Sequence, residues 1–237
     1  MQRSTMFYCL TGCLILSLAG SAFAWLPKLD ESAAKAIVDG VYRRGPDVQT
    51  SSSLSLEVKN GAFDAGGNAV EVYGGDAKCL SDWLNRPKSY TTLGSRPTVL
   101  AVAGQSDFIK AAAIEARDNF KTLTAAAALE VARNRLPDNR LRVFMKIEGL
   151  EKDTLRDAYQ VGVLDVSNKI VAPYQINFLD DWASNGATRA TWSGTMVYYF
   201  DFSKNQVDTN GVLKFLLRTE ADSDCAYKIN INLASFK

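Results

Sequence analysis

Apolar and polar residues alternate with a period of two in run after run from Arg140 to the end of the chain. Successive side chains of a β-strand point to opposite faces, so this alternation predicts strands with one buried face. Turn residues such as Gly, Asn and Ser separate the runs, a spacing that is typical of two packed antiparallel sheets. The runs cover residues 143–147, 159–163, 174–178, 195–202, 212–217 and 226–233.

The inward-facing residues of these strands form the predicted core of a β-sandwich domain over residues 139–237. Val212 and Leu213 are neighbours, so only one of them can point inward on a regular strand. The architecture resembles that of immunoglobulin-like domains, but the cysteine pair of such domains is missing because Cys79 lies outside this segment. The predicted core comprises Val143, Met145, Ile147, Val161, Val163, Ile176, Phe178, Met196, Val212, Leu213, Phe215, Ile229 and Ile231.

The preceding segment, residues 25–138, mixes helical and strand patterns, so the predicted fold class is α+β, with a mixed α/β region before the sandwich. Apolar residues at 3.6-residue spacing predict helices, and Ser106 is a good N-cap for the longest of them. The pattern leaves open whether that segment is one helix or two. The expected helices cover residues 30–44, 76–84 and 107–135, and the expected strands lie near residues 54–58, 68–73 and 98–103.

Residues 1–24 have the pattern of a cleavable secretory signal peptide. Arg3 precedes an uncharged apolar stretch, and Ala22-Phe23-Ala24 matches the A-x-A sequence at which signal peptidase cuts. The apolar stretch is about a dozen residues long, which is too short to span a bilayer core of about 30 Å. We therefore expect a secreted or periplasmic protein whose mature chain begins at Trp25.

Two alternatives to a cleaved signal are an uncleaved anchor and a lipoprotein attached through Cys13. The sequence around Cys13 disfavours lipidation, because few apolar residues precede it and apolar rather than polar residues follow it. No stretch after the signal approaches 18 apolar residues, so no transmembrane segment is expected there. The absence of an Asn-x-Ser/Thr sequence favours a bacterial origin.

The charges of the mature chain balance. The chain has 27 Lys and Arg residues against 26 Asp and Glu residues, and loss of Arg3 leaves 26 of each. The basic residues are scattered, whereas a protein that binds nucleic acid needs a basic stripe to neutralise phosphates. We therefore expect no nucleic-acid partner.

Two cysteines, Cys79 and Cys225, remain after the signal is removed, and only one pairing is available to them. Disulfides form and persist in the compartments to which signal peptides direct proteins. The sequence therefore predicts a Cys79–Cys225 disulfide that closes a loop of 225 minus 79, or 146, residues.

The chain contains no histidine. Ser-His-Asp and Cys-His catalysis need an imidazole as general base, and zinc and copper sites rely on imidazole or thiolate ligands. This composition disfavours ordinary serine and cysteine hydrolases and zinc or copper enzymes. Ser32 and Lys35 do match the Ser-x-x-Lys nucleophile pattern, but the accompanying motifs of that enzyme class are missing and Ser32 suits the first turn of a helix.

Two groups of residues are candidate binding sites. The first is an expected loop with Asp180, Asp181, Trp182 and Asn185, where the indole could stack on a sugar or a protein partner, or could instead pack on the core. The second is the alternating carboxylates Glu220, Asp222 and Asp224, whose oxygens suit calcium, although a solvated turn has the same pattern. No other cofactor is expected.

The sequence thus favours an exported, non-enzymatic binding or cell-envelope structural protein with a protein or carbohydrate partner. The alternative is a secreted or periplasmic hydrolase that uses carboxylate or Ser/Lys chemistry without histidine. A paired-carboxylate glycosidase would draw its residues from Asp180, Asp181 or Glu220.

Overall fold

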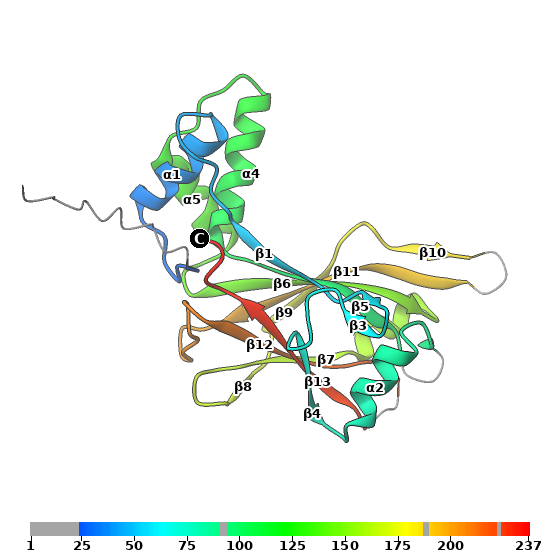
Figure 1. Cartoon of the computed structure of the whole chain (residues 1–237). Helices are drawn as coiled ribbons and strands as arrows, with labels where there is room; N and C mark the ends of the chain where they lie inside the picture. Colours follow the sequence, from blue (N-terminus) through cyan, green and yellow to red (C-terminus); the bar gives the residue numbers. More distant parts are fainter. Residues whose placement is uncertain (1–23, 91–93, 187–189, 222–223) are drawn as a thin grey trace, which may run out of the picture.

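The structure, a computed structural model, describes residues 24–90, 94–186, 190–221 and 224–237. It combines helices with antiparallel sheets, as the sequence predicts. Figure 1 shows a helical lobe at one end of two sheets that lie one above the other. The helices are α1 (Glu31–Val41), α2 (Lys78–Asn85), α4 (Gln105–Asp118) and α5 (Ala125–Arg135), and a short 3₁₀ helix, η1, spans Asp153–Ala158.

Each sheet contains strands from both halves of the chain. The first sheet has the order β1 (Ser51–Ser55), β5 (Arg96–Ala103), β6 (Arg140–Leu150) and β11 (Thr191–Asp201), and both β9 (Gln175–Phe178) and β10 (Ala183–Asn185) pair with β11. The second has the order β4 (Val70–Gly74), β13 (Ala226–Asn232), β12 (Val212–Arg218), β7 (Gln160–Leu164) and β8 (Ile170–Val171). A separate hairpin joins β2 (Val58–Lys59) to β3 (Ala62–Phe63). Strand β4 pairs with β13, and β5 pairs with β6, so both sheets cross the boundary expected near residue 138.

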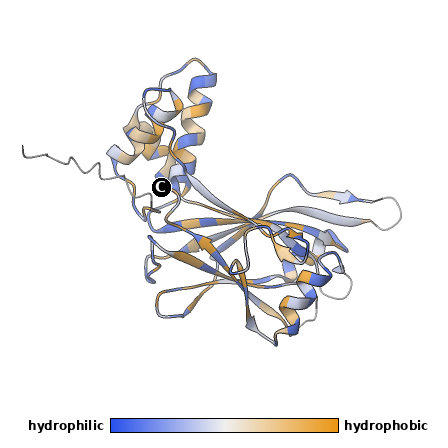
Figure 2. Ribbon diagram, in the orientation of Figure 1, coloured by the Kyte–Doolittle hydropathy of each residue, from blue (hydrophilic) through white to orange (hydrophobic). Residues whose placement is uncertain are grey.

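Side chains from both sheets share one hydrophobic core. Figure 2 shows apolar residues distributed along the strands of both sheets. Val161 and Phe178 pack against this core and are half-buried. The buried residues that the alternation predicts are Val143, Met145, Ile147, Val163, Met196, Leu213, Phe215, Ile229 and Ile231.

The prediction was wrong for Val212 and Ile176, which are both 46% exposed. Leu213 points inward opposite Ile231, so its neighbour Val212 must point outward. Ile176 does share a face with the buried Tyr198, its partner on β11. It is exposed because β9 is at the margin of its sheet, where Ile176 lines a cavity instead of packing between the sheets.

The predicted disulfide is confirmed. Cys79 on α2 is bonded to Cys225, which immediately precedes β13. Trp83, one turn further along α2, is buried edge-on between Phe63 and Tyr227. The bond and the aromatic contacts together hold α2 against the second sheet.

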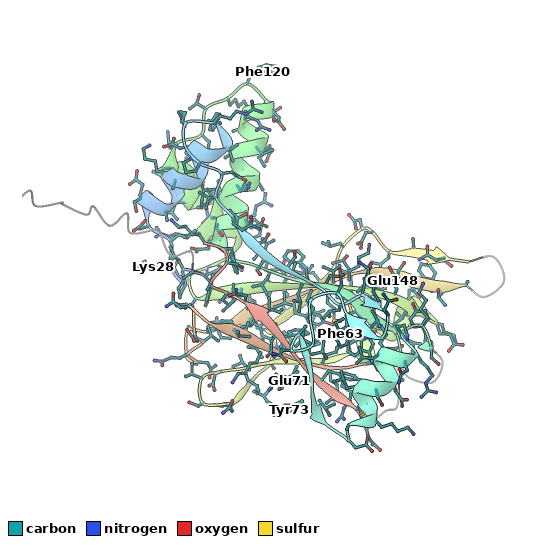
Figure 3. The ribbon with its side chains drawn as sticks, viewed as in Figure 1. Lys28, Phe63, Glu71, Tyr73, Phe120 and Glu148 are labelled. Atoms are coloured by element: carbon teal, nitrogen blue, oxygen red, sulfur yellow. A yellow bond between two sulfur atoms is a disulfide. The ribbon has the colours of Figure 1, made fainter. Side chains whose placement is uncertain are left out.

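The helical lobe has a core of its own, formed by α1, α4 and α5. The predicted segment 107–135 is two helices. Phe120 follows α4 with a left-handed φ of 57°, and Thr124 caps α5 by accepting a hydrogen bond from the backbone N–H of Ala127. Phe120 is fully exposed at the far end of the lobe (Figure 3).

Within the described ranges, no helix combines the length and apolar character needed to cross a bilayer. The predicted signal peptide, apart from Ala24, and Cys13 lie outside the described residues. Trp25 is 1% exposed, and its ring packs edge-on against Phe202.

Candidate functional site

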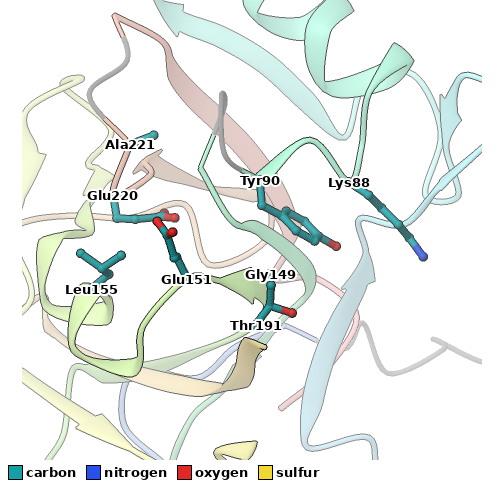
Figure 4. A pocket seen from close by; sticks show the side chains of 8 residues that line it. All are labelled: Lys88, Tyr90, Gly149, Glu151, Leu155, Thr191, Glu220 and Ala221. Atoms are coloured by element: carbon teal, nitrogen blue, oxygen red, sulfur yellow. The ribbon is translucent and has the colours of Figure 1, made fainter. Parts of the chain in front are cut away.

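A pocket of about 320 Å³ lies where the chain leaves β6 and β12. Glu151 and Glu220 both point into it, and Figure 4 shows their carboxylates on the same side of the space. We call it the carboxylate pocket. Its lining comprises Lys88, Tyr90, Gly149, Glu151, Leu155, Thr191, Glu220 and Ala221.

Tyr90 forms one wall of the carboxylate pocket. Its ring lies against Gly149, where a Cβ atom would come within 2.2 Å of the ring. Gly149 also has a φ of 88°, a conformation that favours glycine. Tyr90 and Lys88 also line a second pocket of about 240 Å³, next to Arg96 and Trp83. Burial lowers the pKa of Arg96, whose guanidinium lies 5.2 Å from the centroid of the Trp83 ring.

A buried polar cluster holds Glu220 in place. One oxygen of Glu220 accepts a hydrogen bond from the backbone N–H of Ser95 at 2.7 Å, and the other accepts one from the Ser95 hydroxyl at 3.0 Å. The Ser95 hydroxyl also contacts the phenol of Tyr159. Burial, followed by the charge of Glu220, raises the pKa of Tyr159 well above its usual value. The cluster therefore fixes the residue that directly follows η1.

The predicted binding loop around Trp182 is anchored to β11. Asp181 accepts hydrogen bonds from the backbone N–H of Thr195 at 2.9 Å and from its hydroxyl at 2.6 Å. The Trp182 ring then lies over Gly194, where a Cβ atom would come within 2.4 Å of it. A short acidic side chain and a glycine thus determine where the indole lies.

Trp182 is half-buried, and its ring meets that of Phe178 edge-on, with centroids 6.0 Å apart. The guanidinium of Arg156, from η1, stacks on both rings, at 4.0 Å from the Phe178 centroid and 4.9 Å from that of Trp182. The negative face of an aromatic ring attracts a cation in this position. Arg156 is therefore held in one place at the open edge between the sheets.

Arg156 and Phe178 also line a cavity of about 310 Å³, which we call the arginine pocket. Much of its wall is apolar or aromatic. The Tyr198 hydroxyl donates to the sulfur of Met196 at 3.3 Å, and sulfur is a weak acceptor. Burial raises the pKa of Tyr198. The remaining lining residues are Asp157, Tyr159 and Ile176.

Two buried donors at this place have no acceptor among the described residues: Nε of Arg156 and Nε1 of Trp182. Native proteins pair nearly all buried polar groups, because an unpaired buried donor costs about 1–3 kcal/mol. The part of the chain that the structure describes also provides no ion pair for Arg156. Both atoms are covered, so an anion would reach Arg156 through its terminal nitrogens, for which the described chain provides no hydrogen bond.

The other residues of the predicted Trp182 site are not brought to this pocket. Asp180 is exposed in the turn before Trp182. The side-chain amide of Asn185, on β10, donates to the Ser193 hydroxyl across the hairpin. Of the four residues that the sequence singles out in this loop, only Trp182 contacts Arg156.

The predicted calcium ligands are only partly described. Glu220 is engaged with Ser95, Asp224 is exposed, and Asp222 lies outside the described residues. No group of three side chains suited to a metal ion occurs among the described residues. The calcium site therefore stays a prediction.

Ser32 and Lys35 are exposed on α1 and have separate partners. The hydroxyl of Ser32 donates to Asp30 at 2.7 Å, and the ammonium of Lys35 pairs with Asp39. Both side chains of the Ser-x-x-Lys sequence therefore make local contacts with aspartates in or next to α1.

No family model, curated protein or solved structure matches this chain.

Proposed function

We propose that the protein is an exported, non-enzymatic binding protein that holds its ligand in the arginine pocket. The observation that carries the proposal is Arg156, which is stacked on Phe178 and Trp182 and has a buried Nε without an acceptor in the described chain. Small-molecule sites are concave and mostly apolar, with a few placed polar groups that orient the ligand. The arginine pocket has this composition, with Arg156 as its cationic group.

Export is the part of the proposal that accounts for the disulfide. The Cys79–Cys225 bond is compatible with an oxidising compartment such as the periplasm or the medium. We extend the proposal to the architecture: an immunoglobulin-like arrangement of two sheets, with the recognition site at an open edge between them. A ligand that enters the cavity suits this site better than a protein or carbohydrate partner stacked on Trp182, because the Trp182 ring is already packed on Phe178.

Binding of anilinonaphthalene sulfonate, a fluorescent anion with an apolar body, tests the proposal. The folded protein should bind one probe per chain, and Arg156→Gln should weaken binding by tenfold or more, which corresponds to about 1.4 kcal/mol. Arg140→Gln is the matched control, because Arg140 stacks on Tyr174 at 4.7 Å but is paired with Asp201. Equal binding by all three proteins, or no saturable binding, would contradict the proposal.

The carboxylate pocket favours a second candidate function, a hydrolase of the paired-carboxylate type. Glu151 and Glu220 face the same pocket (Figure 4), and two facing carboxylates are the machinery of most glycoside hydrolases. A panel of glycoside substrates tests this candidate. Turnover that Glu151→Gln abolishes would establish it, and absence of turnover across the panel would remove it.

A further inference from the structure

The chemistry of the arginine pocket indicates what kind of ligand it takes. We infer that the ligand is an amphipathic monocarboxylate, with its carboxylate on Arg156 and an alkyl chain of about eight to ten carbons in the cavity. This inference rests on the proposed function, because it names the ligand class of the same site.

The head group follows from Arg156. A guanidinium is a planar fork of donors that matches the two oxygens of a carboxylate. Stacking on Phe178 and Trp182 fixes the plane of the fork before a ligand arrives, so little side-chain entropy is lost on binding. A single arginine, without a second cation among the residues that line the pocket, suits one negative charge rather than the two of a phosphate.

The tail follows from the walls and the volume. Ile176, Phe178 and Met196 line the cavity together with the rings of two tyrosines. Ile176 is the inward-facing residue of β9 that the second sheet leaves uncovered, at 46% exposure. At about 30 Å³ for a group the size of a water molecule, the cavity of about 310 Å³ accommodates about ten such groups. An unbranched chain of that length would cover Ile176.

Asp157 provides a way to test the sign of the charge on the ligand's head group. It lines the same pocket but is exposed, and it forms no ion pair with Arg156 in the described chain. Its carboxylate repels an anionic ligand and attracts the ammonium group of a zwitterion such as an amino acid. Asp157→Asn should therefore tighten the binding of a fatty acid and weaken the binding of an amino acid.

Displacement of anilinonaphthalene sulfonate by hexanoate, octanoate and decanoate, with octanol, octylamine, octyl phosphate and phenylalanine for comparison, tests the inference. We expect affinity to rise about fourfold per methylene group up to decanoate. Octanoate should bind at least tenfold more tightly than octanol. Arg156→Gln should remove that difference, Arg156→Lys should reduce it, and Arg140→Gln should leave it unchanged. Thermal melts confirm that each variant is folded.

The other possible outcomes distinguish an error in the ligand class from an error in the proposed binding function. A bound probe that octanoate does not displace, or octanol that binds as well as octanoate, contradicts the carboxylate and leaves the binding function in place. If phenylalanine displaces the probe and Asp157→Asn weakens that displacement, the ligand is a zwitterion and not a monocarboxylate. If octyl phosphate displaces the probe more strongly than octanoate does, the ligand is a phosphate. Failure of the probe itself to bind at one site contradicts the proposed function.

Discussion

The guanidinium carbon of Arg156 lies 4.0 Å from the centre of the Phe178 ring. Arg156 is on η1, which leads from β6 of the first sheet to β7 of the second, and Phe178 ends β9 at the margin of the first sheet. The contact therefore joins the connection between the sheets to an edge strand. It places a cation beside a cavity that neither sheet closes.

Gly194→Ala should displace the Trp182 ring, because the added Cβ would lie 2.4 Å from it. The indole would then leave Phe178 and Arg156, and its fluorescence should shift to longer wavelength as water reaches it. Probe binding in the arginine pocket should weaken at the same time. Asp181→Asn is the matched change in the loop anchor, and we expect a smaller shift of the same kind from it. An unchanged emission spectrum in Gly194→Ala would show that the ring position does not depend on this glycine.

Phe215→Ala should reduce the free energy of unfolding by about 3–5 kcal/mol, the usual cost of truncating a fully buried phenylalanine. Phe215 is completely buried and contacts the rings of Tyr198 and Phe200. Phe178→Ala should cost less than half as much, because Phe178 is only half-buried. Urea unfolding of the two variants measures both values, and equal losses would contradict the assignment of Phe178 to the pocket wall.

The raised pKa of Tyr159 predicts how stability depends on pH. A group whose pKa is higher in the folded state stabilises the protein below its unfolded pKa, here about 10, and loses that contribution as pH rises above it. The free energy of unfolding should therefore fall as the pH rises above about 10. Tyr159→Phe should show a smaller fall, although other buried tyrosines such as Tyr198 keep part of it. An identical fall in wild type and variant would contradict burial of the Tyr159 phenol.

Reduction of the Cys79–Cys225 bond should lower the melting temperature. The bond closes a loop of 146 residues, for which the chain-entropy model gives a stabilisation of about 5 kcal/mol as an upper value. At about 2–4 °C per kcal/mol for a chain of this size, this upper value corresponds to a decrease of at most roughly 10–20 °C. Calorimetry with and without reductant measures it. Two alkylatable thiols in the unreduced mature protein would contradict the bond itself.

Strand positions could be predicted from the sequence because alternation marks each buried face locally. Strand partners could not, since pairs such as β4 with β13 depend on which distant segments cover one another. The short strands β8 and β10 carry too few residues for a period to be visible. Ile176 shows the limit of the alternation pattern. The pattern correctly predicts the face of β9 on which Ile176 lies, but whether the second sheet covers that face depends on the whole fold.

The candidate site was predictable only in part. Trp182 stands out as an aromatic residue in a polar loop, and the structure places its ring against Phe178, which lines the arginine pocket. Arg156 carries no such signal, because η1 shows neither helical nor strand periodicity. Its importance arises from contacts with residues more than 20 positions away in the sequence, Phe178 and Trp182, which local patterns do not contain.

A pH titration of octanoate labelled with an NMR-active isotope at its carboxyl carbon shows whether the arginine pocket binds an anion. Bound next to the Arg156 cation, the carboxylate should show a pKa below its value in free solution, by about 1 unit or more. Arg156→Gln should abolish the decrease, and Arg140→Gln should retain it. A bound carboxylate whose pKa is unchanged or raised in the wild-type protein would contradict the assignment of the arginine pocket as an anion-binding site.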